Sequence, residues 1–281
     1  MANLTILRTY ALRKPTELPP SVLFSFSEKN MTIFDAYPKS IFHFLVLPRV
    51  LSPEPTSLLK PSDKDTCPQS SVQEPETPPP SVTDLSSLRA LLNSKSISKD
   101  RAKQVILSLK EDALGVKAEI EKEMQKRYGF IWDVWIGFHG VPSMEHMHLH
   151  VLSADLHSER MKNKKHYNSF HPKHGFFLHV DEVLAWFEAK PSYYQNIAKL
   201  SPNKYEPLLK EPLVCFHCDV EKKNMPTLKA HLQEEWEKLK KSTETPKKRK
   251  LAVDQRQKSP ISNEGESDSS PALKKSKTDK S

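Results

Sequence analysis

Three histidines alternate with bulky apolar residues between His146 and Val151, directly after the turn-forming segment Gly140–Met144. Because the side chains of a β-strand alternate between its two faces, a strand here would carry His146, His148 and His150 on one face. The apolar side chains would cover the other face and could pack into a core. Near neutral pH an imidazole can serve as nucleophile, base, acid or metal ligand. The pattern indicates nucleophilic phosphoryl chemistry, and the plainer alternative is a zinc site or a solvated, histidine-rich strand face.

The order His-φ-His-φ-His-φ-φ, where φ is apolar, resembles the signature of the histidine triad (HIT) superfamily of nucleotide hydrolases and transferases. The flanking segments Gly137–Met144 and Lys162–Phe170 resemble the aprataxin family, whose members reverse the 5′-adenylation of DNA that abortive ligation leaves. The resemblance runs from near the N-terminus to about Lys240, apart from one insertion. It is to aprataxin-like proteins of the fungal type, so the FHA domain of animal aprataxins is not expected.

This resemblance implies a fold, an activity and partners. The implied fold is α+β: a HIT domain with an antiparallel sheet and packed helices, followed by a small zinc-finger module. The implied activity is that of a hydrolase, which releases AMP from 5′-adenylated DNA through a covalent AMP-histidine intermediate and restores the 5′-phosphate for repair. The expected partners are nicked or 5′-adenylated DNA and RNA–DNA junctions, with AMP as product. The sequence does not rank these ends or 3′-guanylylated ends.

Two other functions stay open. One is a HIT hydrolase acting on small adenylated or dinucleotide substrates, for which a zinc finger would be idle. The other is a non-catalytic, nucleic-acid-binding zinc-finger protein with a degenerate triad, and the intact triad argues against it.

The resemblance also implies roles for individual residues around the triad. His148 is expected to attack the α-phosphorus and to carry the AMP-histidine intermediate. His146 and His150 would orient it and contact phosphate oxygens. His139, at the end of the preceding strand, would assist the leaving group as general acid, and Ser143 could donate a hydrogen bond to the phosphate.

Further residues could hold the substrate. The loop Asp35–Pro38 resembles the nucleotide loop of the family, which implies that Asp35 accepts hydrogen bonds from ribose hydroxyls. Lys39 could face the nucleic acid. Lys165 and His166 belong to a basic cluster whose resemblance to aprataxins implies phosphate contacts. The alternatives are an ordinary turn for Asp35 and a solvated surface for the basic residues.

The cysteines indicate a metal site. There are three in the chain, too few for a disulfide framework, and Cys215 and Cys218 form a Cys-x-x-Cys pair. A redox pair is the alternative, but no thioredoxin-like βαβ pattern surrounds it. Cys67 lies alone in the predicted insertion.

A helix predicted over 227–238 supplies the remaining ligands. His231 and Glu235 are four residues apart, so their side chains share one helix face. A tetrahedral structural zinc site needs four ligands, and a carboxylate can be one of them. Glu234 and His217 are the alternative fourth ligands. The predicted set for structural Zn²⁺ is Cys215, Cys218, His231 and Glu235.

Periodicity and composition divide the chain into parts. Strands are predicted at 22–26, 31–35, 42–47, 132–139 and 146–154, and a long helix begins after the capping residue Ser98. The predicted HIT-like domain covers 1–190, with a Pro- and Ser-rich disordered insertion at about 51–80. The predicted zinc-finger DNA-binding module covers 191–241, and a disordered basic tail covers 242–281.

Composition favours a polyanionic partner. The 281 residues carry a net charge of +8 with a pI near 9.2, and nucleic acid is the first candidate for such an excess. No apolar run approaches the length of a membrane span, so no membrane partner is expected. The segment Pro246–Lys250 resembles a nuclear-localisation signal and Lys274–Lys277 is a second basic cluster, so a nuclear location is expected.

Overall fold

The computed structural model describes residues 4–51 and 79–257. The chain divides into two compact units, Met1–Lys240 and Lys241–Ser281. The first unit contains the sheet, the histidine-rich segment and the Cys-x-x-Cys pair. Both the predicted HIT-like part and nearly all of the predicted finger part therefore fall within one unit, and the boundary at residue 190 stays a prediction.

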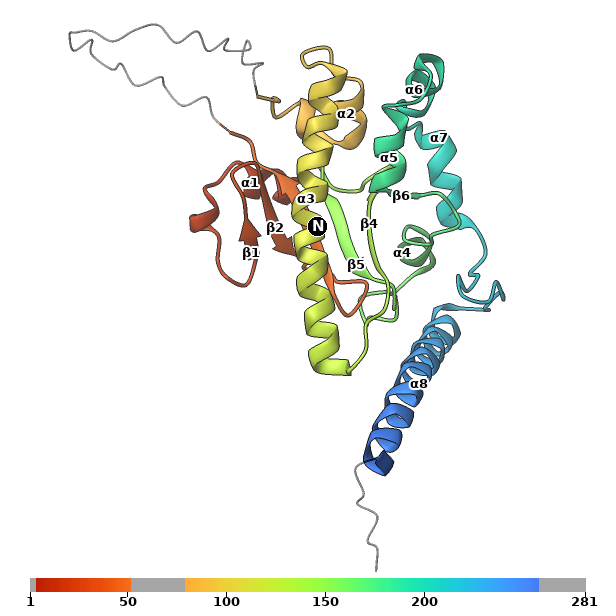
Figure 1. Ribbon diagram of the computed structural model, residues 1–281. Helices are drawn as coiled ribbons and strands as arrows, with labels where there is room; N and C mark the ends of the chain where they lie inside the picture. Colours follow the sequence, from red (N-terminus) through yellow and green to blue (C-terminus); the bar gives the residue numbers. More distant parts are fainter. Residues whose placement is uncertain (1–3, 52–78, 258–281) are drawn as a thin grey trace, which may run out of the picture. The chain divides into compact units, whose positions relative to one another are not determined.

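A six-stranded antiparallel sheet forms the centre of the first unit (Figure 1). Its strand order is β1-β2-β3-β5-β4-β6, which places β5 between β3 and β4. In this register His150 of β5 lies opposite Leu45 of β3 and Gly137 of β4. A Cβ atom at Gly137 would come within 2.5 Å of the carbonyl oxygen of Leu178, so only glycine fits there. The strands are β1 (Leu23–Phe26), β2 (Asn30–Phe34), β3 (His43–Pro48), β4 (Val134–His139), β5 (Leu149–Ser153) and β6 (Phe177–His179).

The long helix α3 (Lys99–Tyr128) covers one face of the sheet (Figure 1). The Ser98 side chain caps it by accepting a hydrogen bond from the Arg101 backbone N–H. Gly129 ends it in the left-handed conformation, with φ of 77°. Its buried residues recur at helical spacing and share a core with Val46 and Val151. Because neighbouring side chains alternate, His150 faces away from α3.

Helix α1 (Ile6–Ala11) lies on the opposite face of the sheet, whereas α2 (Leu88–Leu92) and α5 (Val180–Trp186) pack in the same core as α3. Leu7 of α1 packs with Leu45 and Leu47 of β3 in a separate small core, on the same face as His150. The remaining helices are α4 (Lys164–Asn168), α6 (Pro191–Ile197), α7 (Pro202–Tyr205) and α8 (Met225–Gln257), with 3-10 turns at Pro15–Glu17, Asp84–Ser86 and Glu206–Lys210. None of the helices in the described part of the chain is both long and apolar enough to cross a bilayer.

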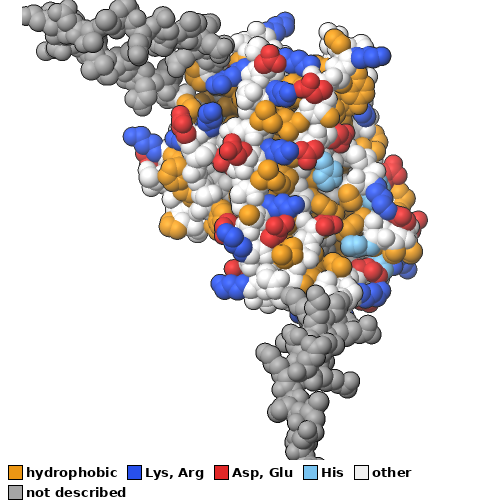
Figure 2. Space-filling view, viewed as in Figure 1, with side chains coloured by type: hydrophobic (Ala, Val, Ile, Leu, Met, Phe, Trp, Pro, Cys, Tyr) orange, Lys and Arg blue, Asp and Glu red, His pale blue; other side chains and the backbone are white. Residues whose placement is uncertain are grey.

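Charged side chains of both signs cover part of the surface. On the face seen in Figure 2, Lys and Arg side chains are interspersed with Asp and Glu. Three ion pairs that involve α3 are Lys110–Asp181, which joins it to α5, and Lys117–Glu121 and Lys122–Glu119 within it. Balanced charges of this kind give little net field for a polyanion.

The predicted α+β class with an antiparallel sheet is confirmed; most strand ends differ from the prediction by one or two residues, and two boundaries differ by more. The strand predicted from residue 146 begins only at Leu149, because His146 has a φ of 87° that no strand residue adopts. Helix α8 continues through Gln257, into the segment predicted to be a disordered tail. The predicted insertion lies almost wholly outside the described residues, as do Cys67 and Lys274–Lys277.

Candidate active site and metal centre

Four imidazoles meet on the sheet face opposite α3. His43 begins β3, His139 ends β4, His148 directly precedes β5, and His150 lies within β5. The ring of His150 is central, with centroid distances of 4.4 Å to His139, 5.0 Å to His148 and 5.3 Å to His43. Antiparallel pairing of three neighbouring strands thus gathers histidines that are far apart in the sequence.

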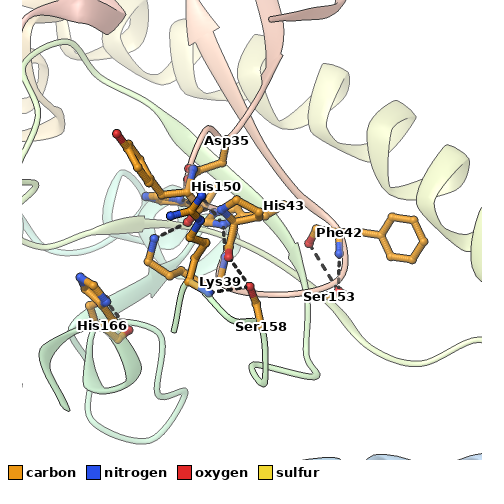
Figure 3. Close-up of polar contacts among 12 residues, drawn as sticks. Asp35, Lys39, Phe42, His43, His150, Ser153, Ser158 and His166 are labelled. Atoms are coloured by element: carbon orange, nitrogen blue, oxygen red, sulfur yellow. Dashed lines mark hydrogen bonds and ion pairs between the residues drawn. The ribbon is translucent and has the colours of Figure 1, made fainter. Parts of the chain in front are cut away.

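A chain of hydrogen bonds fixes the tautomer of His150. The Lys39 backbone N–H donates to Nδ1 of His43 (3.1 Å), so this nitrogen carries the lone pair and Nε2 carries the proton. Nε2 of His43 lies 3.0 Å from Nδ1 of His150 and therefore donates to it. The remaining proton of His150 is on its Nε2, which is buried and has no partner among the described residues. Figure 3 shows Lys39, His43 and His150 close together.

His148 has the complementary arrangement. Its Nδ1 lies 2.8 Å from the carbonyl oxygen of His146, and a carbonyl can only accept, so Nδ1 carries the proton. Nε2 then presents a lone pair. Burial lowers the pKa of His148, which keeps the ring neutral at pH 7. A neutral imidazole with a fixed free lone pair is suited to nucleophilic attack.

His146 does not share a strand face with the other two histidines, so that prediction is wrong for this residue. Its backbone is left-handed, and its N–H donates to the carbonyl oxygen of Ser86 (2.9 Å). Its ring Nε2 lies 2.7 Å from the carbonyl oxygen of Pro48, at the end of β3. The uncommon φ turns the His146 carbonyl toward His148, and holding that ring is its visible contribution to the site.

Burial keeps the whole cluster neutral. Desolvation lowers the pKa of His43 and of His146 to about 4. It lowers the pKa values of His139 and His150 well below their ordinary value of 6.5, and neighbouring imidazoles add to the shift. At pH 7 the cluster therefore offers lone pairs and N–H donors and no imidazolium charge.

The nucleotide-loop residues lie beside this cluster. Asp35 Oδ1 accepts a hydrogen bond from the Tyr37 backbone N–H (2.7 Å), and its Oδ2 lies 3.5 Å from Nδ1 of His43. The Lys39 ammonium donates to the Tyr37 carbonyl oxygen, and burial lowers its pKa. Its charge also lowers the pKa values of His43 and His150, so it acts on the cluster.

The other predicted substrate contacts lie farther out. Lys165 is exposed on α4, and His166 is half-buried beside it. Figure 3 shows His166 apart from the His43–His150 group. Ser143 is exposed on the loop between β4 and β5. Within the described residues, no hydrogen bond joins Lys165, His166 or Ser143 to the four histidines.

Donor atoms of three predicted zinc ligands converge in the first compact unit. One atom each from Cys215, Cys218 and His231 lies within 4.8 Å of the others. Cys218 Sγ is 3.2 Å and Glu235 Oε1 is 3.9 Å from the same ring nitrogen, His231 Nε2. Ligand atoms around tetrahedral zinc stand about 3.3–3.8 Å apart, so these positions fit the ion with small adjustments. Glu234 faces the other ring nitrogen, with Oε2 4.0 Å from Nδ1.

Local structure forms this centre. Val214 and Glu221 form an isolated antiparallel bridge, and the Asp219 N–H donates to the Cys215 carbonyl oxygen (2.8 Å). Asp219 has a φ of 58°, which aspartate tolerates better than most residues. The His217 N–H points at Cys215 Sγ (3.4 Å), a contact that favours a thiolate. Helix α8 then brings in the remaining predicted ligands, His231 and Glu235.

Comparison with known proteins places the chain in a family. An aprataxin-like protein of Saccharomyces cerevisiae is 30% identical over 239 residues, which cover 81% of this chain and 95% of that protein. The chain belongs to the aprataxin family. Residues 173–238 match a model described as C2HE / C2H2 / C2HC zinc-binding finger, and 94–166 match one described as scavenger mRNA decapping enzyme C-term binding.

Solved structures of aprataxin relatives have the same fold. The aprataxin ortholog Hnt3 from Schizosaccharomyces pombe superposes with a TM-score of 0.54 at 22% identity, covering 83% of this chain and 92% of that one. Aprataxin ortholog Hnt3 in complex with DNA gives 0.53 and 22%, covering 84% and 96%. Aprataxin of Gallus gallus is 28% identical over 219 residues, which cover 78% of this chain and 52% of its own length. This chain thus spans about half of that relative, and 15% of the Drosophila melanogaster aprataxin-like protein.

Two aprataxin-site residues escape the sequence patterns. His43 fixes His150, but a lone histidine at the start of an apolar strand gives no sign of this without the register of β3 and β5. The Phe170 ring lies 4.6 Å from His139 and 5.2 Å from His150, and it forms an apolar wall. Phe170 ends the segment Lys162–Phe170, which contains the basic cluster, and this position is the sequence feature that could have predicted its place in the site.

Proposed function

We propose that this protein hydrolyses the AMP–DNA linkage of 5′-adenylated DNA ends and leaves a 5′-phosphate that can be ligated. One observation carries the proposal: the Nε2 lone pair of His148 is fixed beside the unpartnered Nε2–H donor of His150 in a buried site. Membership of the aprataxin family and the Hnt3 complex with DNA support DNA as the substrate.

The chemistry is a double displacement at phosphorus. His148 Nε2 attacks the α-phosphorus of the adenylate, the bond to the oxygen of the DNA 5′-phosphate breaks, and AMP remains on the ring. Water then attacks the same phosphorus and releases AMP, and its proton returns to solvent. The buried Nε2–H of His150 donates to a non-bridging oxygen, where negative charge develops.

His139 serves the leaving group in this proposal. Its Nε2 is buried without a partner among the described residues, 4.4 Å from His150 between ring centroids. The ring is neutral in the free protein, because burial lowers its pKa. A bound phosphate brings negative charge close to the ring, which raises that pKa and allows His139 to donate a proton to the leaving oxygen.

The surrounding residues hold the two halves of the substrate. Asp35 accepts hydrogen bonds from the ribose of AMP, and Lys39 neutralises phosphate charge next to the cluster. Lys165, His166 and Ser143 contact the DNA backbone, in agreement with their accessible positions outside the cluster: Lys165 and Ser143 are exposed and His166 is half-buried. RNA–DNA junctions present the same adenylated phosphate and are included as substrates.

A structural zinc ion holds the finger in this proposal. Cys215, Cys218, His231 and Glu235 bind it, and the ion takes no part in the phosphoryl chemistry. Glu235 is preferred over Glu234 because it approaches the ring nitrogen that Cys218 also approaches. The Glu234 carboxylate, near Nδ1, is placed to orient the imidazole. The finger adds a DNA-binding surface, and the basic segment Pro246–Lys250 directs the protein to the nucleus.

A nicked duplex with a 5′-adenylated end tests the proposal. Wild type should release AMP and produce a 5′-phosphate, whereas His148→Ala should bind the DNA and release no AMP. The matched control is His174→Ala, which removes an imidazole outside the cluster and should retain turnover. Binding without AMP release by wild type would contradict the proposal and direct the search to small adenylated substrates.

A further inference from the structure

A pocket adjoins the histidine cluster along the chain. It has a volume of about 510 Å³, within the range of about 300–1,000 Å³ typical of ligand sites. One wall is the loop Gly140–Glu145, which joins His139 to His146. The other walls come from the segment before α1, the turn before α2 and residues near Leu200.

Backbone hydrogen bonds hold three of these segments together. The Glu145 N–H donates to the Leu4 carbonyl oxygen (2.8 Å), and the His146 N–H donates to the Ser86 carbonyl oxygen (2.9 Å). The second of these bonds involves the residue whose own carbonyl fixes His148. The pocket is therefore anchored to the proposed catalytic machinery.

The open charge in the pocket is positive. Its lining contains two charged side chains, Arg89 and Glu145. Glu145 is neutralised by Arg8, with Nη1 2.6 Å from Oε1. Arg89 is exposed and its guanidinium makes no hydrogen bond or ion pair within the described residues. A planar guanidinium with all its donors available is suited to a phosphate oxygen pair.

The rest of the lining suits a nucleotide. The Ser87 hydroxyl oxygen accepts a hydrogen bond from the Ala90 N–H, which leaves its proton free to donate. Ser143 also lines the pocket and is exposed. The remaining wall is apolar and includes Val141, Met144 and Leu200, against which a base or a sugar can pack. One cavity thus offers a guanidinium for a phosphate, hydroxyl groups for hydrogen bonds, and an apolar wall for a base or a sugar.

We infer that this pocket binds the DNA strand next to the adenylated end, with a phosphodiester on Arg89 and the attached nucleoside on the apolar wall. The inference rests on the proposed function and deepens it. Arg89 becomes a residue that determines specificity, because a small AMP ester has no phosphodiester to place there. The protein would thereby select a polynucleotide leaving group over a small one.

The test compares two substrates and two variants. Wild type, Arg89→Gln and Lys126→Gln are assayed on a 5′-adenylated nicked duplex and on a small AMP phosphoramidate. Lys126 is the matched control, since it is an exposed lysine near the end of α3. Loss of a hydrogen bond to a charged group weakens binding by about 10-fold or more. The ratio of kcat/KM for DNA to kcat/KM for the phosphoramidate should therefore fall about 10-fold in Arg89→Gln and stay unchanged in Lys126→Gln.

Salt dependence gives a second readout. Loss of one phosphate contact should reduce the slope of log Kd for DNA against log salt by about 0.9 in Arg89→Gln, with no change in Lys126→Gln. An unchanged ratio, or equal loss on both substrates, would overturn the inference while DNA turnover by wild type upholds the proposed function. If wild type turns over only the phosphoramidate, both fail.

Discussion

The histidine cluster and the zinc centre are built in opposite ways. The cluster is assembled by pairing of β3, β5 and β4, and its imidazoles are buried and neutral. The zinc centre is assembled by one tight turn and one helix, and Cys218 remains exposed. Chemistry at phosphorus benefits from a rigid, dry site, whereas holding DNA requires a surface. One compact unit thus keeps a buried cluster built on the sheet and a more exposed centre built on a turn and a helix on separate structural supports.

Breaking the hydrogen-bond chain at His43 should have the largest effect. His43→Phe removes the donor to Nδ1 of His150, so the His150 tautomer is no longer fixed and its Nε2–H is lost for part of the time. We expect kcat for AMP release to fall about 100-fold. Zinc content and DNA affinity should change little. AMP release is measured in single-turnover assays, with zinc measured on the same preparation.

His43→Gln is the conservative counterpart. The glutamine amide can donate toward Nδ1 of His150 and should recover part of the loss. Equal activity of His43→Phe and wild type would show that the hydrogen-bond chain through His43 has no role in AMP release. Loss of zinc together with activity would show that the two regions are not independent.

Local patterns in the sequence predicted one region better than the other. The Cys-x-x-Cys pair and the i, i+4 pair His231 and Glu235 lie close together because of turn and helix geometry alone, so spacing was enough to propose them. The histidine alternation predicted His148 and His150 together, but it failed at His146, where a left-handed backbone replaces the strand.

Long-range pairing accounts for most of what was missed. His43 enters the site through the register of β3 on β5, and β6 is too short for a pattern to show. The α+β class and the long helix were predictable because apolar periodicity repeats over many residues there. The Arg89 pocket joins segments from four parts of the chain, and no single motif contains it.

Zinc removal tests the zinc centre in the way that His43→Phe tests the histidine cluster. Cys218→Ser, or a strong chelator, should weaken binding to nicked duplex about 10–100-fold, because the turn loses the ion that closes it. Turnover of a small AMP phosphoramidate should stay within a few-fold of wild type. Fluorescence anisotropy and a phosphoramidate assay on the same samples measure both.

Matched variants locate the ligands. Cys67→Ser removes the cysteine that is not a predicted ligand and should keep its zinc. Glu235→Gln should lower zinc retention in chelator competition more than Glu234→Gln, because only Glu235 faces the nitrogen shared with Cys218. The reverse order would assign the fourth position to Glu234.

Folding stability should fall in acid because the buried histidines are held neutral. This is the smallest of the expected effects. The pKa values of His43 and His146 are about 4 in the folded protein against an ordinary value of 6.5, so the unfolded chain binds more protons between these values. Stability is therefore fully present above pH 6.5 and is lost as pH falls toward 4, by about 1.4 kcal/mol per pH unit for each histidine. The raised pKa of the Asp155 carboxyl acts in the opposite direction, but it is common to wild type and His43→Gln and cancels in their difference.

Urea denaturation at a series of pH values measures this difference, with a chelator present to remove the contribution of zinc release. The loss of stability per pH unit in acid should be smaller for His43→Gln than for wild type. Identical slopes would mean that His43 is protonated as readily in the fold as outside it, and the tautomer chain to His150 would then lose its physical basis.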